Sequence, residues 1–221
     1  MIASMDIKPE TPWDGTPDVS ARIVTTIGRI ASVMRSGVWE FATAENLNPA
    51  QTEILQLLLA RTHGVRVSWL ALQMSVSVAS VSDSVATLVA KGLVRKARAE
   101  DDGRASALFL TGDGTRLAGR IGGALDFADQ AAGALPHQMQ VELLTGLLKL
   151  IAQLHKTERF PELRACLSCA HFEPNKYPGQ PAPHHCALVG APLPIFFIRI
   201  DCAEHVPTDP ATQQRNWAVF A

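Results

Sequence analysis

The chain has 221 residues and a mass of 23.8 kDa, and 47% of its residues are apolar, 19% charged and 6% aromatic. This composition fits a globular protein and excludes a disordered, collagen-like or coiled-coil chain. Basic and acidic residues nearly balance, 20 against 21, so the surface is not basic enough for indiscriminate binding to nucleic acid. No apolar stretch approaches the roughly 20 residues that cross a bilayer, and charged residues and prolines interrupt the region where an export signal needs an apolar run. We therefore expect a cytoplasmic protein with no membrane partner.

The first 44 residues predict an arm followed by a long helix. Residues 1–18 contain three prolines and no apolar period, so we expect a flexible arm. A helix is expected to start near Asp18 or Ser20. From there to about Ala44, apolar residues recur at steps of three and four, which is typical of an amphipathic helix that buries one face against a partner.

Residues 48–92 have the pattern of a helix-turn-helix unit, in which two short helices meet at a steep angle. The predicted elements are a helix from Asn48 and Pro49 to about residues 63–64, a short strand at 65–67, a helix capped by Ser68 that runs to residue 74, and a helix capped by Ser77 that runs to Lys91. Gly92 is expected to end the last helix in a left-handed conformation. Strand-like runs at 93–98 and 107–111, joined by a loop at 99–106, predict a hairpin that serves as a wing.

Two further helices are predicted after the wing. Thr111 is expected to cap a helix that runs to about residue 134, and Pro136 to open another that runs to about residue 154. With the first helix they leave three apolar stripes outside the small winged domain, which is more than one protomer can cover. The sequence therefore predicts a homodimer with a long helical dimerisation region.

Over roughly residues 20–156, the order of these elements and several motifs resemble the MarR family of bacterial winged-helix transcription regulators. The motifs are Asn48-Pro49-Ala50-Gln51 with Ile54-Leu55, Ser75-Val76-Ser77 through Val81-Ser82, Lys91-Gly92-Leu93-Val94-Arg95-Lys96, and Asp101-Asp102-Gly103-Arg104 followed by Leu108, Leu110-Thr111 and Gly114. The resemblance implies a dimeric repressor or activator that binds a pseudo-palindromic operator in double-stranded DNA. It also implies a response to a small molecule, a metal or an oxidant.

The helix at 78–91 is the candidate DNA-reading helix. Its apolar residues share one face and should pack inward, which turns small polar side chains towards a major groove. The inward residues are expected to be Val81, Val85, Leu88 and Val89. The expected DNA contacts are Ser77, Ala79, Ser80, Ser82, Asp83 and Thr87, with Arg95 and Lys96 on the following strand and Arg104 at the tip of the wing, in the minor groove.

Asp83 departs from the family pattern, which often has a basic residue in the middle of this helix. Its carboxylate repels phosphate, so we expect it to accept a hydrogen bond from a cytosine amino group or from a neighbouring Ser or Arg. The modest basic charge of the region leaves an alternative open, in which the winged helix contacts only proteins.

All four cysteines lie in the last quarter of the chain. Cys166-Leu-Ser-Cys169 is followed by Cys186 after sixteen residues and by Cys202 after fifteen more. Nine of the fourteen prolines lie between residues 161 and 210, so we expect a loop-rich module with little core of its own, to which a bound metal centre would supply folding energy. One CxxC pair with two distant cysteines favours an iron–sulfur cluster, nearer four irons than two, because a cluster takes ligands from separate loops. The pattern resembles the cysteine-rich tail of some redox-responsive bacterial regulators.

Zinc is the alternative occupant of this module. Cys202-Ala-Glu-His205 can act as a second knuckle against the CxxC pair, which leaves Cys186 over, although a zinc ribbon prefers two CxxC knuckles. Further candidate ligands are His171, His184 and His185. Free thiols or disulfides are a third interpretation, which a reducing compartment disfavours. Arg199 and Asp201 near Cys202 are expected to pair with each other. The side chains expected to be buried around the centre or against the helices are Phe172, Phe196 and Phe197.

The sequence therefore predicts a mainly α protein with a small β-wing. The expected parts are an arm at 1–18, a dimerisation and winged-helix domain at 19–159, a four-cysteine module at 160–206 and a tail at 207–221. The leading hypothesis is a homodimeric regulator whose operator binding is controlled by an iron–sulfur cluster that senses redox state, iron or oxygen. The alternative is a regulator that answers to a small organic ligand in the cleft between the dimer and winged domains, with a structural zinc in the tail. Enzymatic activity is not expected, because a nucleotide-binding Gly loop, a GxSxG motif, an HExxH motif and a convincing triad are all missing.

Overall fold

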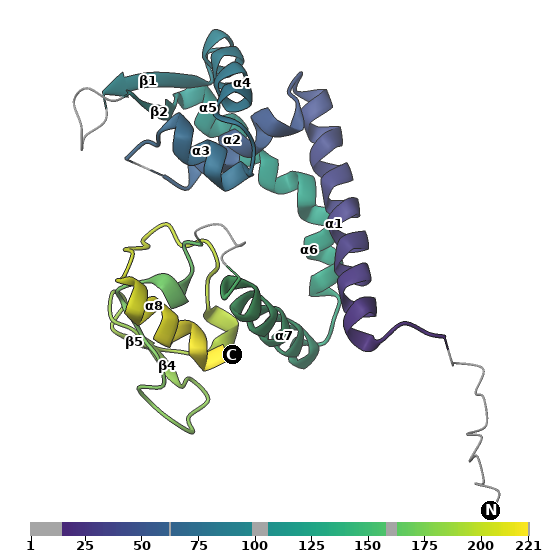
Figure 1. The fold of residues 1–221 in the computed structure, drawn as a ribbon, viewed down its shortest axis with the longest axis vertical. Helices are drawn as coiled ribbons and strands as arrows, with labels where there is room; N and C mark the ends of the chain where they lie inside the picture. The colour runs from purple at the N-terminus through teal and green to yellow at the C-terminus, as the bar shows by residue number, and fades with distance from the viewer. Residues whose placement is uncertain (1–14, 62, 99–105, 158–162, 221) are drawn as a thin grey trace, which may run out of the picture.

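The computed structural model describes residues 15–61, 63–98, 106–157 and 163–220, which form a helical N-terminal part and a smaller C-terminal module (Figure 1). The helices are α1 (Val19–Ala44), α2 (Pro49–Leu59), α3 (Val67–Met74), α4 (Val78–Ala90), α5 (Gly112–Ile121), α6 (Asp126–Gly133), α7 (His137–His155) and α8 (Pro210–Trp217). The strands are β1 (Val94–Arg98), β2 (Ser106–Leu110), β3 (Phe172–Glu173), β4 (His184–Cys186) and β5 (Ala191–Leu193).

Helix α1 starts where the sequence predicts, and α2 starts with the predicted cap. Asn48 Oδ1 accepts a hydrogen bond from the Gln51 N–H at 2.8 Å, and Gln51 Oε1 accepts from the Asn48 N–H at 3.2 Å, with Pro49 in the first turn. The predicted end of α2 near residues 63–64 was wrong, because the helix ends at Leu59. The chain then turns through Gly64, whose φ of 72° lies in the left-handed region.

Helices α3 and α4 form the predicted helix-turn-helix, with a bend of 115° between them. Ser77 Oγ accepts from the Ser80 N–H at 3.1 Å and so caps α4, and Gly92 has the expected positive φ of 70°. Two details were wrong: residues 65–67 form a single bridge between Val65 and Leu108 instead of a strand, and α3 has Arg66, not Ser68, at its N-cap.

No single helix in the described part of the chain is long and apolar enough to cross a membrane; α3 and α4 pass that test only as a bent pair.

The first hydrophobic core holds the winged domain together. It collects the inner faces of α2, α3, α4 and α5, Ala42 of α1 and both strands of the hairpin, and its largest fully buried side chains are Ile54, Leu55, Leu70, Val81, Val85, Leu88, Val94, Leu108 and Ile121. Strands β1 and β2 pair antiparallel, with Arg95 opposite Phe109 and Lys96 opposite Leu108. The tip of the wing, including Arg104, lies outside the described residues.

The helix predicted from Thr111 to residue 134 is interrupted. α5 ends at Ile121, a 3₁₀ turn covers Gly122–Leu125, and α6 begins at Asp126. The Gly122-Gly123 pair has low helix propensity, which allows the break. α1 packs closely at this point, because a Cβ on Gly37 would lie 2.6 Å from the carbonyl oxygen of Ala124.

Gly114 on α5 has no room for a side chain. A Cβ there would lie 1.9 Å from the backbone carbonyl oxygen of Leu93, just before β1. We expect Gly114→Ala to lower the free energy of unfolding by about 3 kcal/mol, because backbone must move to relieve the clash. Gly119→Ala on the same helix is the matched control: nothing lies within 4 Å of its added Cβ, so this change should raise stability by about 0.5–1 kcal/mol. Urea unfolding followed by circular dichroism measures both, and equal midpoints for the two variants would contradict the packing.

The C-terminal module is more structured than the sequence predicts. Strands β3, β4 and β5 form an antiparallel sheet in that order, with Phe172 opposite Cys186 and His184 opposite Leu193. Helix α8, which the sequence analysis did not predict, is capped by Asp209, whose Oδ1 accepts from the Thr212 N–H at 3.0 Å.

The expectation that this module has little core was wrong. A second hydrophobic core includes Leu148 and Ala152 of α7, and its other buried members are Ala165, Leu167, Cys169, Phe172, Ile198, Trp217 and Phe220. Trp217 of α8 also stacks on His155 of α7, with ring centroids 5.3 Å apart. The module therefore packs directly on a helix that the sequence analysis assigned to the dimerisation region.

Candidate functional site

The outer face of α4 is exposed to solvent and can contact another molecule. The predicted DNA-contact residues on it, Ser77, Ala79, Ser80, Ser82, Asp83 and Thr87, are all exposed. Val81, Val85 and Leu88 are buried, as predicted, with 1% or less of their surface exposed. Val89 was expected to pack inward, but 37% of its surface is exposed. α4 therefore presents a surface of small side chains with one carboxylate.

Two hydroxyl groups on this face donate hydrogen bonds to backbone carbonyls within the helix. Ser82 Oγ donates to the Val78 carbonyl at 2.8 Å, and Thr87 Oγ1 donates to the Asp83 carbonyl at 3.1 Å. Their hydrogens are thus engaged, while their oxygens can still accept hydrogen bonds. This face can therefore approach a partner closely and accept hydrogen bonds, but it is less suited to donating hydrogen bonds to base edges.

The basic residues next to α4 lie on β1. Both Arg95 and Lys96 are exposed, and the Arg95 guanidinium lies 4.6 Å from the centroid of the Phe109 ring across the hairpin. Gly64 makes room for that ring, because a Cβ on Gly64 would lie 2.5 Å from Phe109 Cζ. Stacking on an aromatic ring holds a guanidinium in place without neutralising its charge.

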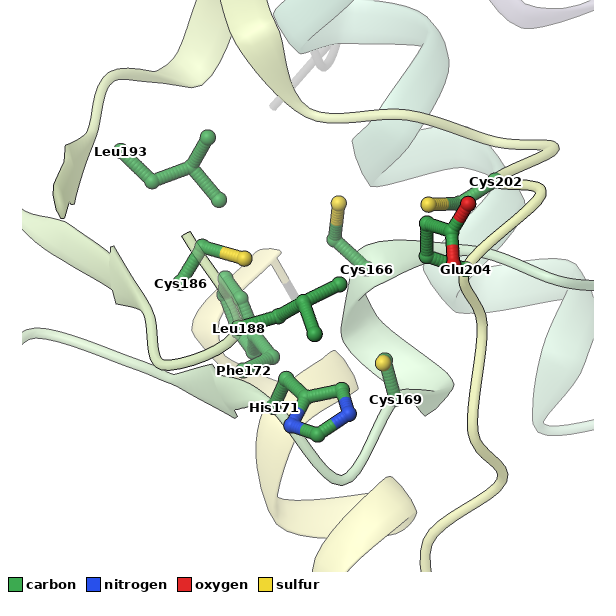
Figure 2. Close-up of a pocket in the computed structure, with 9 residues that line it drawn as sticks. All are labelled: Cys166, Cys169, His171, Phe172, Cys186, Leu188, Leu193, Cys202 and Glu204. Carbon is green, nitrogen blue, oxygen red and sulfur yellow. The ribbon is translucent and has the colours of Figure 1, made fainter. Parts of the chain in front are cut away.

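The four cysteines line one pocket in the C-terminal module, as Figure 2 shows. Cys166 begins a 3₁₀ turn, Cys169 follows that turn, Cys186 ends β4, and Cys202 lies in the loop before α8. The pocket's other lining residues are His171, Phe172, Leu188, Leu193 and Glu204. Its free space, including the open mouth, is about 320 Å³, roughly ten times the ~30 Å³ of one water molecule in the liquid.

All four cysteines are free thiols in the structure. Burial raises the pKa of the Cys166 thiol above its ordinary value; the backbone N–H of Arg199 partly offsets this, and the charges of Cys202, Cys169 and Cys186 raise the pKa further. Among the described residues, no three His, Cys, Asp or Glu side chains are grouped closely enough to hold a single metal ion. The sulfurs are thus near enough to influence one another but spread around a wider space.

Arg199 contacts two of the four cysteines. Its backbone N–H donates to Cys166 Sγ at 3.3 Å, and its Nη1 lies 3.9 Å from Cys202 Sγ. Arg199 was expected to pair with Asp201, but its guanidinium is directed towards the sulfur of Cys202. N–H donors to sulfur stabilise thiolates and tune any centre that thiolates hold.

Of the candidate histidine ligands, His171 lines the pocket, whereas His184, His185 and His205 lie beside it. His205 Nε2 is 3.0 Å from Ser168 Oγ, and His185 Nδ1 is 3.3 Å from Tyr177 Oη. His184 Nδ1 accepts from the Asn175 N–H at 3.1 Å, and burial lowers the His184 pKa, which favours the neutral form that can accept this hydrogen bond. These contacts hold together the segments that carry the cysteines.

Two other expectations are changed by the structure. Phe172 is buried against the pocket, but Phe196 and Phe197 are 43% and 63% exposed, so they do not shield it. Glu204 lines the pocket and was not singled out from the sequence; its position two residues after Cys202 is the signal that could have identified it.

The N-terminal part of the chain is similar to known proteins. Residues 45–105 match the model of the MarR family, a segment that ends before the first cysteine. No curated protein matches.

Similar solved structures include a MarR-family transcriptional regulator from Silicibacter pomeroyi, with 23% identity, a TM-score of 0.52, and coverage of 62% of this chain and 92% of that one. CouR from Rhodococcus jostii RHA1, crystallised with p-coumaroyl-CoA, has 19% identity, a TM-score of 0.51, and coverage of 61% and 95%. MepR from S. aureus in complex with DNA has 18% identity, a TM-score of 0.50, and coverage of 59% and 96%. The helical N-terminal part of the chain, with its helix-turn-helix and hairpin, therefore has the winged-helix fold of the MarR family.

Proposed function

We propose that the protein is a homodimeric, non-enzymatic DNA-binding transcription regulator of the MarR type, whose affinity for a pseudo-palindromic operator is set by an iron–sulfur cluster on Cys166, Cys169, Cys186 and Cys202. The observation that carries this proposal is the convergence of four cysteines on one pocket, in a module that packs on α7 of a chain with a winged-helix domain. A cytoplasmic location follows from a role on DNA.

Dimerisation is supported by apolar surface that one chain leaves uncovered. Helix α1 is 26 residues long, and 48% of Ile23, 53% of Ile30 and 57% of Val33 are exposed. On α7, Met139 and Leu143 add to this uncovered apolar surface, since both are about half exposed. A run of exposed apolar residues on two long helices is typical of a protein–protein interface, and a second copy with the same stripes would cover it.

DNA binding by β1 can be tested through its salt dependence. We expect Arg95→Ala and Lys96→Ala each to weaken binding and to reduce the slope of log affinity against log salt by about 1, since each removes one phosphate contact. The probe is a duplex selected by the protein from random sequence, and binding is measured by fluorescence anisotropy. Lys176→Ala is the control, because Lys176 pairs with Glu173 in the C-terminal module. An unchanged slope in both β1 variants would contradict this placement of the DNA.

We favour an iron–sulfur cluster over a single zinc ion because one CxxC pair with two distant cysteines suits a centre that takes ligands from separate loops. Four thiols line a pocket with apolar walls from Phe172, Leu188 and Leu193. A bound cluster, [4Fe–4S] in our proposal, supplies a redox couple and sensitivity to oxidants. The chain's own contribution is to hold four thiolates, exclude water with the apolar walls and donate N–H groups from Arg199 to two sulfurs.

Anaerobic purification followed by an absorption spectrum and metal analysis tests the occupant. A brown protein with a broad band near about 400 nm and several irons and sulfides per chain is expected. A colourless protein with about one zinc per chain would overturn the cluster and favour the alternative, a structural zinc with a small organic effector bound elsewhere.

A further inference from the structure

Arg164 joins the cysteine module to the winged domain. Its guanidinium donates to the carbonyl of Ala60 at the end of α2 through Nη1, and to the carbonyl of Ala203 through Nη2 at 2.6 Å. Ala203 directly follows Cys202. One half-buried side chain thus bridges a cysteine loop and a helix of the DNA-binding domain, which are more than a hundred residues apart in the sequence.

The backbone of Arg164 is fixed to the same loop. The Cys202 N–H donates to the Arg164 carbonyl at 3.0 Å, and the Cys166 N–H donates to the Arg199 carbonyl at 2.9 Å. Segments 164–166 and 199–202 therefore lie side by side, each carrying one cysteine of the pocket. A movement of Cys202 changes the position of both the backbone of Arg164 and the carbonyl that its side chain holds.

At its other end, Arg164 places a positive charge on the C-terminal end of α2. The last turn of α2, residues 56–59, contains only glutamine and leucine, and the guanidinium of Arg61, just beyond it, lies over the ring of Trp69 at 4.1 Å. Carbonyls at a helix C-terminus carry partial negative charge, and a guanidinium bound to them stabilises the helix end. The module therefore provides a cap for a helix of the other domain.

The capped end of α2 is linked to both DNA-contacting elements. Ile54 and Leu55 of α2 share the first core with Val85 and Leu88 of α4. Beyond Ala60, the chain reaches Val65, which exchanges two backbone hydrogen bonds with Leu108 on β2, at 2.8 and 3.2 Å. A shift at Ala60 thus acts on the support of the reading helix and on the base of the wing.

We propose that Arg164 is the positioning residue that transmits the state of the cysteine pocket to the DNA-binding face; this deepens the proposed function and rests on it. With the pocket loaded, the Cys202 loop holds Arg164 on the end of α2. When the pocket is empty, the loop relaxes, the cap is lost, and α4 and the wing are less well fixed for operator binding.

The test compares operator affinity of loaded and stripped protein, in wild type and in Arg164→Met, which keeps the length of the stem but removes the donors. We expect a ratio between the two wild-type states of about 5- to 150-fold, the usual range for coupled sites. In Arg164→Met, the operator affinities of the loaded and stripped states should differ by no more than about twofold, with the iron content per chain unchanged. Arg215→Met is the matched control: this arginine is in the same module, donates to Thr212 on its own helix and should leave the ratio intact.

The outcomes separate the two proposals. A wild-type ratio of one overturns cluster control itself and this inference with it, whereas a full ratio retained in an iron-loaded Arg164→Met variant overturns only the role of Arg164. If the Arg164→Met variant does not hold iron, the inference is tested instead by amide hydrogen exchange, measured on loaded and on stripped wild-type protein. Stripping should then speed exchange in residues 56–61 and leave residues 23–34 of α1 unchanged, and equal exchange at 56–61 in both states would overturn the inference.

Discussion

Replacing both Ile23 and Ile30 by glutamate is expected to give a monomer that binds operator at least about 100-fold more weakly than the wild type. Both side chains lie on one stripe of α1 and are about half exposed in the single chain. Burying two charged side chains in an apolar interface costs more free energy than the surrounding contacts contribute. A monomer also loses the gain of engaging two half-sites at once, which is worth about 10² to 10⁴ in affinity.

Light scattering after gel filtration and fluorescence anisotropy measure the two effects on one sample. Ser32→Glu is the control, because Ser32 is exposed on the opposite side of α1 and the change also introduces a glutamate, with one charge where the double variant has two. This variant should remain dimeric and bind normally. A dimeric double variant with wild-type affinity would show that the dimer uses another surface.

Cys169→Ser is expected to reduce the iron and sulfide content from several per chain to nearly none. A serine oxygen is a poor ligand for iron–sulfur clusters, whereas its size leaves the packing around this buried position intact. Because the winged domain has its own core, the variant should still bind DNA, with the affinity of stripped wild-type protein and with no response to oxidants.

The control for this variant is Val189→Ser. Val189 is 73% exposed, follows Cys186 by three residues and does not line the pocket, so the change should leave iron content and response as they are. A Cys169→Ser protein that retained full iron content would remove this cysteine from the proposed ligand set.

The winged domain was predictable because its signals are local. Asn48 and Ser77 are cap residues at the correct distance from apolar periods, and their side chains make the expected hydrogen bonds in the structure. The break between α5 and α6 was missed because the apolar period continues across Gly122, while the interruption depends on α1 packing close to the backbone there.

The C-terminal module was predictable only in the convergence of its cysteines. Clustering of cysteines indicated a shared pocket, and the structure brings all four to one. Its core could not be predicted, because isolated apolar residues such as Leu167 and Trp217 have no period and are buried only when the module folds and packs on α7. Sequence proximity likewise suggested Asp201 as the partner of Arg199, whereas folding places a sulfur in that position.

The contacts of Arg164 show why sequence reasoning did not identify a link between the two parts. Its partners are two backbone carbonyls, at Ala60 and Ala203, and any residue type supplies a carbonyl. Only the three-dimensional arrangement reveals that one side chain reaches both. Backbone-directed contacts between distant segments leave no signal in a single sequence.

The measurement that tests the central claim most directly is the operator affinity of one anaerobic preparation in three states: intact, oxidised and stripped of metal. Cluster control predicts that the intact protein differs from the stripped protein by about 5- to 150-fold, with the oxidised protein shifted towards the stripped one. The same affinity in all three states would contradict the account, because the cysteine pocket would then have no influence on the DNA-binding face.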